Sequence, residues 1–468
     1  METRTKILLL LLNIALANGL ETLSSVQVIF RHGEKELDGT LEVGGGPLSD
    51  KGKKQMFDLG TYLRSRYAGF IRTEFDSGET SFLSSDKDPV IQSASMVAYG
   101  LYLDFNLAAT WSGEENIQYE PIPVRTLPRQ YDNLIQLTKS CPKNDARIQE
   151  DLNEYVKNFF NQNQASLELY AEKTGDTAIL NGNRNGADRI QNLISFLEAV
   201  KFNSSNNLPL EDWEKQFLQE QDLFQFRSGW FKNYIDTEEK QRLYIGSAVQ
   251  NIPTTFEATP VKKISLFSAH DHTLYTLMAT LGIWDENNLQ LPPDGATLII
   301  EYYDSIGAIT TDPYMKVWYR SETSQEPELL EIPQCGQPCY INKFKEVFAN
   351  IIPANAEKEC KVEGNGEAKP QTLSGSRKRP HLPKIPPLRK RTTTTTVSPK
   401  HIEIVSSTSE NTVQNPPSPV LYSASASVPE KPLNVSGLNI LMGVIVLVVG
   451  TGALIFAAFQ KRRQYISI

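Results

Sequence analysis

The sequence predicts an α/β fold with a mixed, largely parallel sheet, flanking helices and an inserted helical subdomain, followed by a single C-terminal transmembrane helix. Three observations predict it. Short β-branched apolar runs alternate with helical patterns, the middle of the chain carries mainly helical patterns, and an uncharged apolar stretch lies close to the C-terminus. Strands that alternate with helices are typical of α/β domains.

Two short apolar runs are predicted to be buried strands. Val26 to Phe30 is β-branched and bounded by polar residues, and Ile264 to Phe267 has the same character. Runs of this length are typical of buried strands rather than helices.

Helical periodicity follows each of these strands. Ser49 to Phe70 has an N-cap residue at Ser49 and apolar residues at spacings of three and four, namely Met56, Leu59, Leu63 and Tyr67. A second helix is predicted over Thr273 to Leu281, and Gly282 stands where a helix would end.

The middle of the chain is predicted to be a helical insert, at about residues 140–250, within a folded domain at 18–362. Residues 150–173 and 187–202 have helical patterns, and residues 211–241 have them in part.

The N-terminus has the pattern of a signal peptide, at residues 1–17. Arg4 and Lys6 precede the apolar run Ile7 to Leu12, and Ala15-Leu16-Ala17 is a small-x-small cleavage pattern. A buried core strand or short helix is the alternative. The apolar run is too short to cross a bilayer, which favours removal.

The C-terminus is predicted to be membrane-anchored. Leu438 to Phe459 carries no charge, and Lys461-Arg462-Arg463 follows it directly. The predicted transmembrane helix (437–459) therefore leaves a cytoplasmic tail (460–468) and a lumenal or extracellular domain. A removed lipid-anchor signal fits poorly, because basic residues follow the apolar stretch. Tyr465 to Ile468 resembles a lysosomal sorting signal, so the location is a lysosomal or a cell-surface membrane.

A Pro/Ser/Thr-rich segment, residues 363–436, is predicted to be a disordered stalk. It contains the run Thr392 to Thr396 and cannot bury a core. Arg389-Lys390-Arg391 is either a protease site that releases the domain or a solvated basic run in a flexible linker.

Composition excludes one class of partner and indicates an oxidising compartment. The net charge of -8 argues against nucleic-acid binding. The four cysteines, Cys141, Cys335, Cys339 and Cys360, allow three pairings, and their spacing does not suit zinc. Asn203 and Asn434 begin glycosylation sequons.

Only five histidines occur, and the three in the folded region directly follow the two predicted strands. The first loop contains Arg31, His32, Gly33 and Lys35, which place an imidazole among cations. Such loops meet beyond the carboxyl ends of strands, where α/β proteins bind ligands. A phosphoryl group needs positive charge and an in-line attacking atom, so the loop predicts a phosphate site.

The second loop supplies His270, Asp271 and His272 at the start of a helix. A carboxyl group there is suited to protonating a leaving alcohol. The three residues are consecutive, so convergence on one metal ion is disfavoured. The chain has no Gly-x-Ser-x-Gly elbow, so serine-hydrolase chemistry lacks its usual support. A purely structural role for His32 is the remaining alternative.

These motifs resemble the histidine acid phosphatases, including the lysosomal and prostatic types and the insect venom acid phosphatases. The resemblance rests on Val28 to Lys35, Leu48 to Gly52, Pro121 to Val124 and Ser268 to Asp271, and it covers roughly residues 24–360.

The resemblance implies an acid phosphatase that hydrolyses small phosphomonoesters without a cofactor or metal. It implies that His32 attacks phosphorus, that Arg31, Lys35 and His270 bind phosphate, and that Asp271 protonates the leaving group. It also implies a homodimer and two disulfides, Cys141 with Cys360 and Cys335 with Cys339.

The chain also departs from the family pattern. Lys35, Leu83 and Pro89 stand where the family usually has arginines, and His272 stands where it has threonine. Lost donors lower catalytic rate, unless His272 or Arg125 compensates. The alternative function is therefore a catalytically weak relative that binds phosphorylated ligands at a membrane. Larger substrates, such as phosphoinositols or phosphopeptides, also stay open.

Overall fold

A computed structural model describes residues 20–36, 46–103, 121–180, 186–219, 221–284, 290–306, 312–321 and 326–361. The predicted signal peptide, stalk, transmembrane helix and tail, together with Asn434, lie outside the described residues. Within the described ranges, none of the helices has the length and apolar character needed to cross a membrane.

The described strands form one mixed sheet in the order β3-β2-β4-β1-β5-β6-β7, with β8 paired to β6. Their bounds are β1 (Leu20–Arg31), β2 (Thr80–Ser85), β3 (Arg125–Leu127), β4 (Ile264–Ala269), β5 (Thr297–Ile306), β6 (Tyr314–Arg320), β7 (Glu328–Leu330) and β8 (Cys339–Tyr340). The mixed α/β fold predicted from the sequence is confirmed, and β1 and β4 contain the two predicted strands.

The parallel part of this sheet is smaller than the sequence predicted. Strands β3, β2, β4 and β1 are parallel, whereas β5, β6, β7 and β8 pair antiparallel. Parallel neighbours need a crossover, and helices follow β1 and β2. Strands β5, β6 and β7 follow one another with no helix among the described residues between them, and short connections of this kind permit antiparallel pairing.

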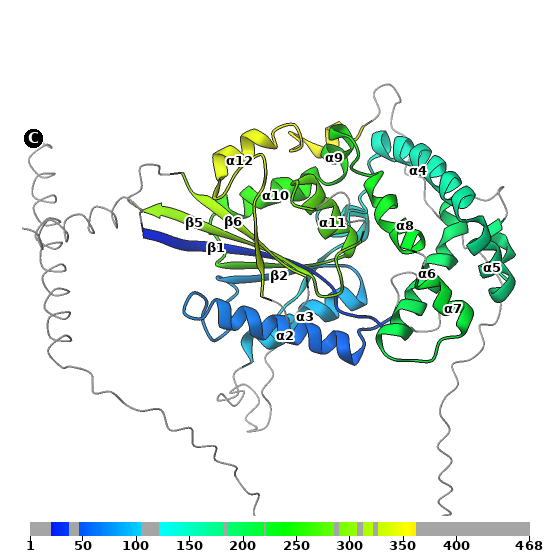
Figure 1. The fold of residues 1–468 in the computed structure, drawn as a ribbon. Coiled ribbons are helices and arrows are strands. Elements are labelled where there is room, and N and C mark those ends of the chain that lie inside the picture. The colour runs from blue at the N-terminus through cyan, green and yellow to red at the C-terminus, as the bar shows by residue number, and fades with distance from the viewer. Residues whose placement is uncertain are drawn as a thin grey trace, which may run out of the picture. The chain divides into compact units, whose positions relative to one another are not determined.

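Helices cover both faces of the sheet (Figure 1). Helices α2 (Asp50–Arg66) and α3 (Asp88–Tyr102) pack on one face, and α10 (Gly246–Glu257), α11 (Asp271–Thr280) and α12 (Ile341–Val347) lie over the other. Alternate residues of β1 enter the two cores: Val28 and Phe30 lie in the core under α2, and Ile29 lies in the core that includes Leu274 of α11. Ser49 caps α2 as predicted, because its side chain accepts from the backbone N–H of Gly52.

A run of helices separates β3 from β4 in the chain. It contains α4 (Pro142–Gln162), α5 (Gln164–Thr174), α6 (Gly186–Ser205), α7 (Asp212–Phe217), α8 (Gln221–Lys232) and α9 (Glu238–Tyr244). These helices have an aromatic core of their own, in which Phe159 and Phe226 are buried. Helices α6 and α8 lie beside the end of the sheet at which β1 finishes (Figure 1).

The helical stretch expected at 150–173 is two helices that meet at Asn163. The Asn163 side chain donates to the carbonyl of Phe159 at 2.9 Å. Such local bonds compete with regular helix, which explains the break between α4 and α5.

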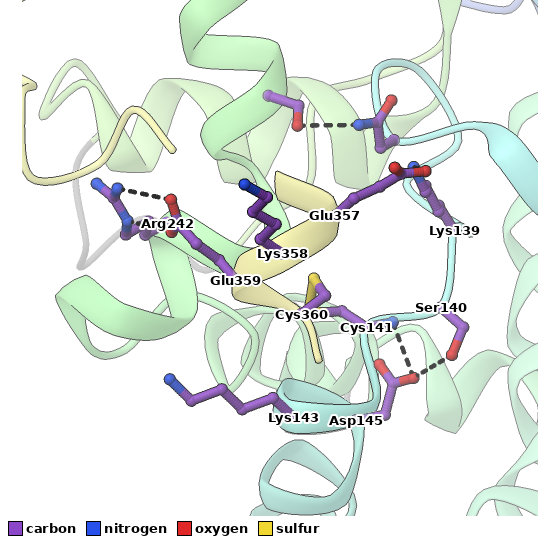
Figure 2. The surroundings of a disulfide bond; sticks show 12 residues. Lys139, Ser140, Cys141, Lys143, Asp145, Arg242, Glu357, Lys358, Glu359 and Cys360 are labelled. Carbon is purple, nitrogen blue, oxygen red and sulfur yellow. Dashed lines mark hydrogen bonds and ion pairs between the residues drawn. A yellow bond between two sulfur atoms is a disulfide. The ribbon is translucent and has the colours of Figure 1, made fainter. Parts of the chain in front are cut away.

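Both disulfides implied by the family resemblance are present. Cys141 pairs with Cys360, and Cys335 pairs with Cys339. Figure 2 shows that Cys141 lies just before α4 and that Cys360 follows α13 (Ala356–Glu359). The first disulfide therefore ties the start of the helical run to the C-terminal part of the folded domain.

Candidate active site

The register of two parallel strands brings the two histidine loops together. Arg31 at the end of β1 pairs with Ala269 at the end of β4, so His32 and His270 both follow directly. The backbone N–H of His32 donates to the Ala269 carbonyl at 3.1 Å. The two imidazole centroids lie 5.8 Å apart with an interplanar angle of 77°. The sequence prediction that these loops converge is therefore correct in geometry.

The His32 ring is buried and its orientation is fixed. Its Nδ1 lies 2.8 Å from the Gly33 carbonyl oxygen. A carbonyl can only accept, so Nδ1 carries the hydrogen and Nε2 of the neutral ring carries a free lone pair. Burial, followed by the charges of Arg31 and Lys35, lowers the pKa of His32 to about 4. The ring is thus neutral in moderately acidic solution.

The loop after His32 packs tightly against the start of α2. A Cβ on Gly33 would lie 2.5 Å from the Gly52 carbonyl oxygen, so only glycine fits there. The Gly33 N–H donates to the Ser93 hydroxyl of α3 at 3.1 Å. The loop is therefore held by contacts with α2 and with α3, the two helices on that side of the sheet.

Arg31 is surrounded by acceptors. Its Nη2 lies 2.9 Å from Asp294 and 3.5 Å from Asp271, and its Nη1 donates to the Pro292 carbonyl at 2.6 Å. Its Nε is buried and donates to none of the described acceptors. The guanidinium is thereby held at the strand end with one donor still unused.

His270 connects the second loop to β2. Its Nε2 lies 2.8 Å from the Ser85 hydroxyl, which ends β2. Burial, followed by the charges of His272 and His32, holds the pKa of His270 well below its usual value. A neutral His270 therefore offers hydrogen bonds rather than a fixed positive charge.

Asp271 is a buried carboxylate that faces two guanidinium groups. Its Oδ2 lies 3.0 Å from Arg227 Nη2 and 3.5 Å from Arg31 Nη2. Burial by itself raises the pKa of Asp271, but the Arg227 and Arg31 charges outweigh it and hold that pKa well below the usual range. Asp271 is therefore ionised in the ligand-free protein.

Three of these contacts were missed in the sequence. Arg227 lies on α8, Ser85 on β2 and Asp294 before β5, and the sequence assigned no role to any of them. Ser85 does belong to the family segment that contains Leu83 and Pro89, and this was the one signal by which it could have been found. Arg227 and Asp294 reach the site only through the folding of distant elements, and no local pattern marks them.

Two other predicted residues, Lys35 and His272, lie in the loops that carry His32 and His270. Lys35 forms a β-bridge with Leu48, and its charge acts on His32. His272 stacks on both His270 and Phe231, and its Nε2 donates to the Gln136 carbonyl at 3.1 Å. The His272 ring is thus held by two stacked rings and one hydrogen bond to the backbone.

Two further positions, Leu83 and Pro89, bear on the predicted loss of cations. Leu83 on β2 pairs in register with Arg125 on β3, and Arg125 is exposed. Pro89 is buried at the start of α3.

Asn203, the predicted glycosylation residue of the folded domain, lies close to the end of α6 and is half-buried.

Among the described residues, no cluster of three or more histidine, cysteine or acidic side chains is arranged to hold a metal ion. The site instead combines an imidazole with a free nitrogen, two guanidinium groups and a carboxyl group at the mouth of an α/β sheet. Such an arrangement suits a phosphoryl group, which is stabilised by preorganised donors and positive charge.

The family follows from comparison with known proteins. Residues 35–320, more than half of the chain, match the Histidine phosphatase superfamily (branch 2), and the chain belongs to this family. The matched range contains His270 and Asp271 and begins just after His32. The family predicted from the sequence is confirmed, and the chain is a phosphatase.

Curated relatives cover most of the chain. Human prostatic acid phosphatase is 27% identical over 361 residues, which are 72% of this chain and 88% of that protein. Bovine lysosomal acid phosphatase is 26% identical, over 73% of this chain and 81% of that protein. Mouse testicular acid phosphatase is 28% identical, over 74% and 84% respectively.

Solved structures agree in fold. The phytase from Citrobacter braakii has a TM-score of 0.50 at 15% identity and covers 73% of this chain and 100% of its own. The phytase of Klebsiella sp ASR1 has a TM-score of 0.50 at 16% identity, over 72% and 98% respectively. At this identity the likeness concerns the fold alone.

Proposed function

We propose that the protein is an acid phosphatase that hydrolyses phosphate monoesters through a phosphohistidine at His32. One observation carries the proposal. Nδ1 of His32 lies 2.8 Å from the Gly33 carbonyl oxygen and donates its hydrogen to it, so Nε2 is the nitrogen left as the nucleophile. The relatives named acid phosphatase support the same substrate class.

The proposed reaction has two steps. His32 Nε2 forms a bond to phosphorus while the bond to the ester oxygen breaks, and Asp271 gives a proton to the departing alcohol. Water then attacks the phosphohistidine, Asp271 takes up its proton, and inorganic phosphate leaves. Arg31, Lys35 and His270 are the proposed ligands of the phosphoryl oxygens, and the unused Nε donor of Arg31 supports this role.

The acidic working range follows from the same site. A neutral imidazole is the nucleophile, and the pKa of His32 is about 4 because burial and then Arg31 disfavour the charged ring. The nucleophile therefore stays active in solution that would protonate an ordinary histidine. This supports an enzyme that works in an acidic compartment.

We place the protein at a lysosomal or cell-surface membrane, with its catalytic domain lumenal or extracellular. The sequence pattern of a signal peptide and a C-terminal anchor supports this, as do the relatives named lysosomal acid phosphatase. Glycosylation at Asn203 and Asn434, shedding at the basic run of the stalk, and a homodimer belong to the same proposal.

A second candidate is a catalytically weak relative that binds phosphorylated ligands. The observation that favours it is Leu83, an apolar residue on β2, which pairs with β4, the strand that ends directly before His270. Leu83→Arg should then raise turnover sharply while phosphate binding changes less. Ordinary enzymatic turnover by the wild type would exclude this candidate.

The proposed function is tested by rapid quench of the purified chain with a labelled phosphoester. We expect a protein-bound phosphoryl group that survives base but is lost in acid, and none in His32→Ala. His381→Ala, which changes a histidine of the predicted stalk, is the matched control and should label like wild type. Activity that survives His32→Ala would remove His32 from the mechanism.

A further inference from the structure

One carboxylate oxygen in the site is shared by two guanidinium groups from separate parts of the fold. Asp271 Oδ2 lies 3.5 Å from Nη2 of Arg31, at the end of β1, and 3.0 Å from Nη2 of Arg227, on α8. An anionic oxygen therefore already bridges the two arginines. A phosphoryl oxygen is the same kind of acceptor and carries more charge.

Arg227 is well placed to accept a new partner. Its side chain is 24% exposed, whereas that of Asp271 is 5% exposed, so the arginine is more open to solvent than the carboxylate with which it pairs. Its other nitrogen, Nη1, lies 2.7 Å from Glu198 on α6. This second ion pair anchors the guanidinium within the helical run whether or not Nη2 stays on Asp271.

We propose that Arg227 is a phosphate-binding residue of this site. On substrate binding it exchanges its contact with Asp271 for a contact with the phosphoryl oxygens, and the helical insert thereby contributes directly to the active site. This inference rests on the proposed function, in which the phosphoryl group binds beside Arg31 and His32.

The exchange has a consequence for proton transfer. Asp271 must carry a proton to serve as the acid, yet Arg227 and Arg31 hold its pKa well below the usual range in the ligand-free protein. A phosphoryl group that draws both guanidinium groups away, and adds negative charge, favours the protonated carboxyl. Substrate binding thus prepares the acid for the alcohol that leaves.

Other ionisable groups also face Asp271. They are His272 and His270 on its own loop and helix, Tyr244 on α9, and Arg31 and Arg227. Of these, the two arginines carry the full positive charges that oppose protonation. Arg227 is the one that can be removed without altering the loop of the nucleophile.

A structural role is the competing explanation, because Arg227 joins α6 and α8 to the start of α11 through Glu198 and Asp271. The two roles differ in what a neutral replacement does. Loss of a structural ion pair lowers stability and leaves the affinity for phosphate in place. Loss of a phosphate ligand weakens that affinity.

The test compares Arg227→Gln and Arg227→Lys with the wild-type full-length chain. Calorimetric titration with inorganic phosphate is done in the His32→Ala background, where binding is measured without turnover. We expect Arg227→Gln to weaken phosphate binding at least about tenfold, the loss of one charge-assisted bond, and Arg227→Lys to retain part of the affinity. The control is Arg147→Gln, an exposed arginine of α4 that pairs with Glu239.

The pH profile of kcat for an aryl phosphate supplies the second readout, since it reports groups of the enzyme–substrate complex, in which Asp271 carries its proton. Without the Arg227 charge the pKa of Asp271 in that complex rises, so the alkaline limb of kcat should move to higher pH. Unchanged phosphate affinity in Arg227→Gln would overturn the inference. Absence of phosphohistidine in the wild type would instead refute the proposed function, and the binding experiment separates the two failures.

Discussion

His32 shows how burial determines the working pH of a nucleophile. Its active form is the neutral ring, so activity should fall as pH drops through the pKa of about 4. Burial contributes most to that low pKa, Arg31 next and Lys35 after it. An ordinary exposed histidine would already lose its lone pair near pH 6.5.

Lys35→Gln should move the acid limb of kcat/KM to higher pH. Removing the Lys35 charge weakens its repulsion of the protonated ring, so the pKa of His32 rises toward its usual value. The pH profile of aryl phosphate hydrolysis measures the shift. Lys51→Gln is the control, because that lysine pairs with Glu34 and its charge is not among those that act on His32. An acid limb that stays in place in Lys35→Gln would contradict this account.

The sequence predicted the residues that sit in local motifs and missed those that arrive from elsewhere. His32 and His270 stand directly after apolar runs that read as strands, so their convergence could be inferred. Arg227, in contrast, reaches Asp271 across 44 positions of chain, through the packing of α8 on α11. No local pattern encodes such a contact.

At the scale of elements, the contact between α2 and α3 depends on two glycines. A Cβ on Gly60 would lie 2.3 Å from the Val97 carbonyl oxygen, and one on Gly100 would lie 2.2 Å from the Phe57 carbonyl oxygen. Because these neighbours are backbone atoms, they cannot move aside cheaply. The helices approach closely, and α3 thereby holds Ser93 against the nucleophile loop.

Gly60→Ala should therefore destabilise the protein, although alanine is the better helix former by about 1 kcal/mol. Overpacking costs about 1–3 kcal/mol, and the backbone contact places this site at the upper end. Urea denaturation should show a lower midpoint. Lys54→Ala, an exposed change on the same helix, should leave the midpoint nearly unchanged. A stabilised Gly60→Ala would mean that the two helices can separate freely.

The helix boundaries that the sequence predicted well are those marked by a residue that favours the start or the end of a helix. Ser49 caps α2, and Gly282, with a φ of 72°, follows α11. The antiparallel strands β5 to β8 were not predicted, because their pairing is determined by contacts between segments far apart in the chain rather than by local propensity.

At the scale of the whole folded domain, the helical run must stay docked for Arg227 to reach the site. Two features hold the two ends of that run to the C-terminal segment. At its start is the disulfide between Cys141 and Cys360, and in its last helix is Arg242 of α9, which bonds both carboxylate oxygens of Glu359 at 2.6 and 2.9 Å (Figure 2). Glu359 ends α13 and Cys360 follows it, so the disulfide and the ion pair act on the same short segment.

The two disulfides should differ in their contribution to stability. Cys141–Cys360 spans a sequence separation of 219 residues, and Cys335–Cys339 spans 4. In the chain-entropy account, a longer loop restricts the unfolded chain more, and the two disulfides differ by about 3.5 kcal/mol.

Replacing both Cys141 and Cys360 by alanine should lower the free energy of unfolding by about 2–5 kcal/mol, as is usual for a native disulfide. The matched replacement of Cys335 and Cys339 should cost less. Urea denaturation monitored by tryptophan fluorescence measures both.

If the helical run depends on this link for docking, the Cys141/Cys360 variant should also bind phosphate more weakly below its unfolding transition, because Arg227 is then held less firmly. Equal losses of stability in the two variants would show that loop length does not determine the effect, and native phosphate affinity would show that the packing of α8 on α11 is sufficient to position Arg227.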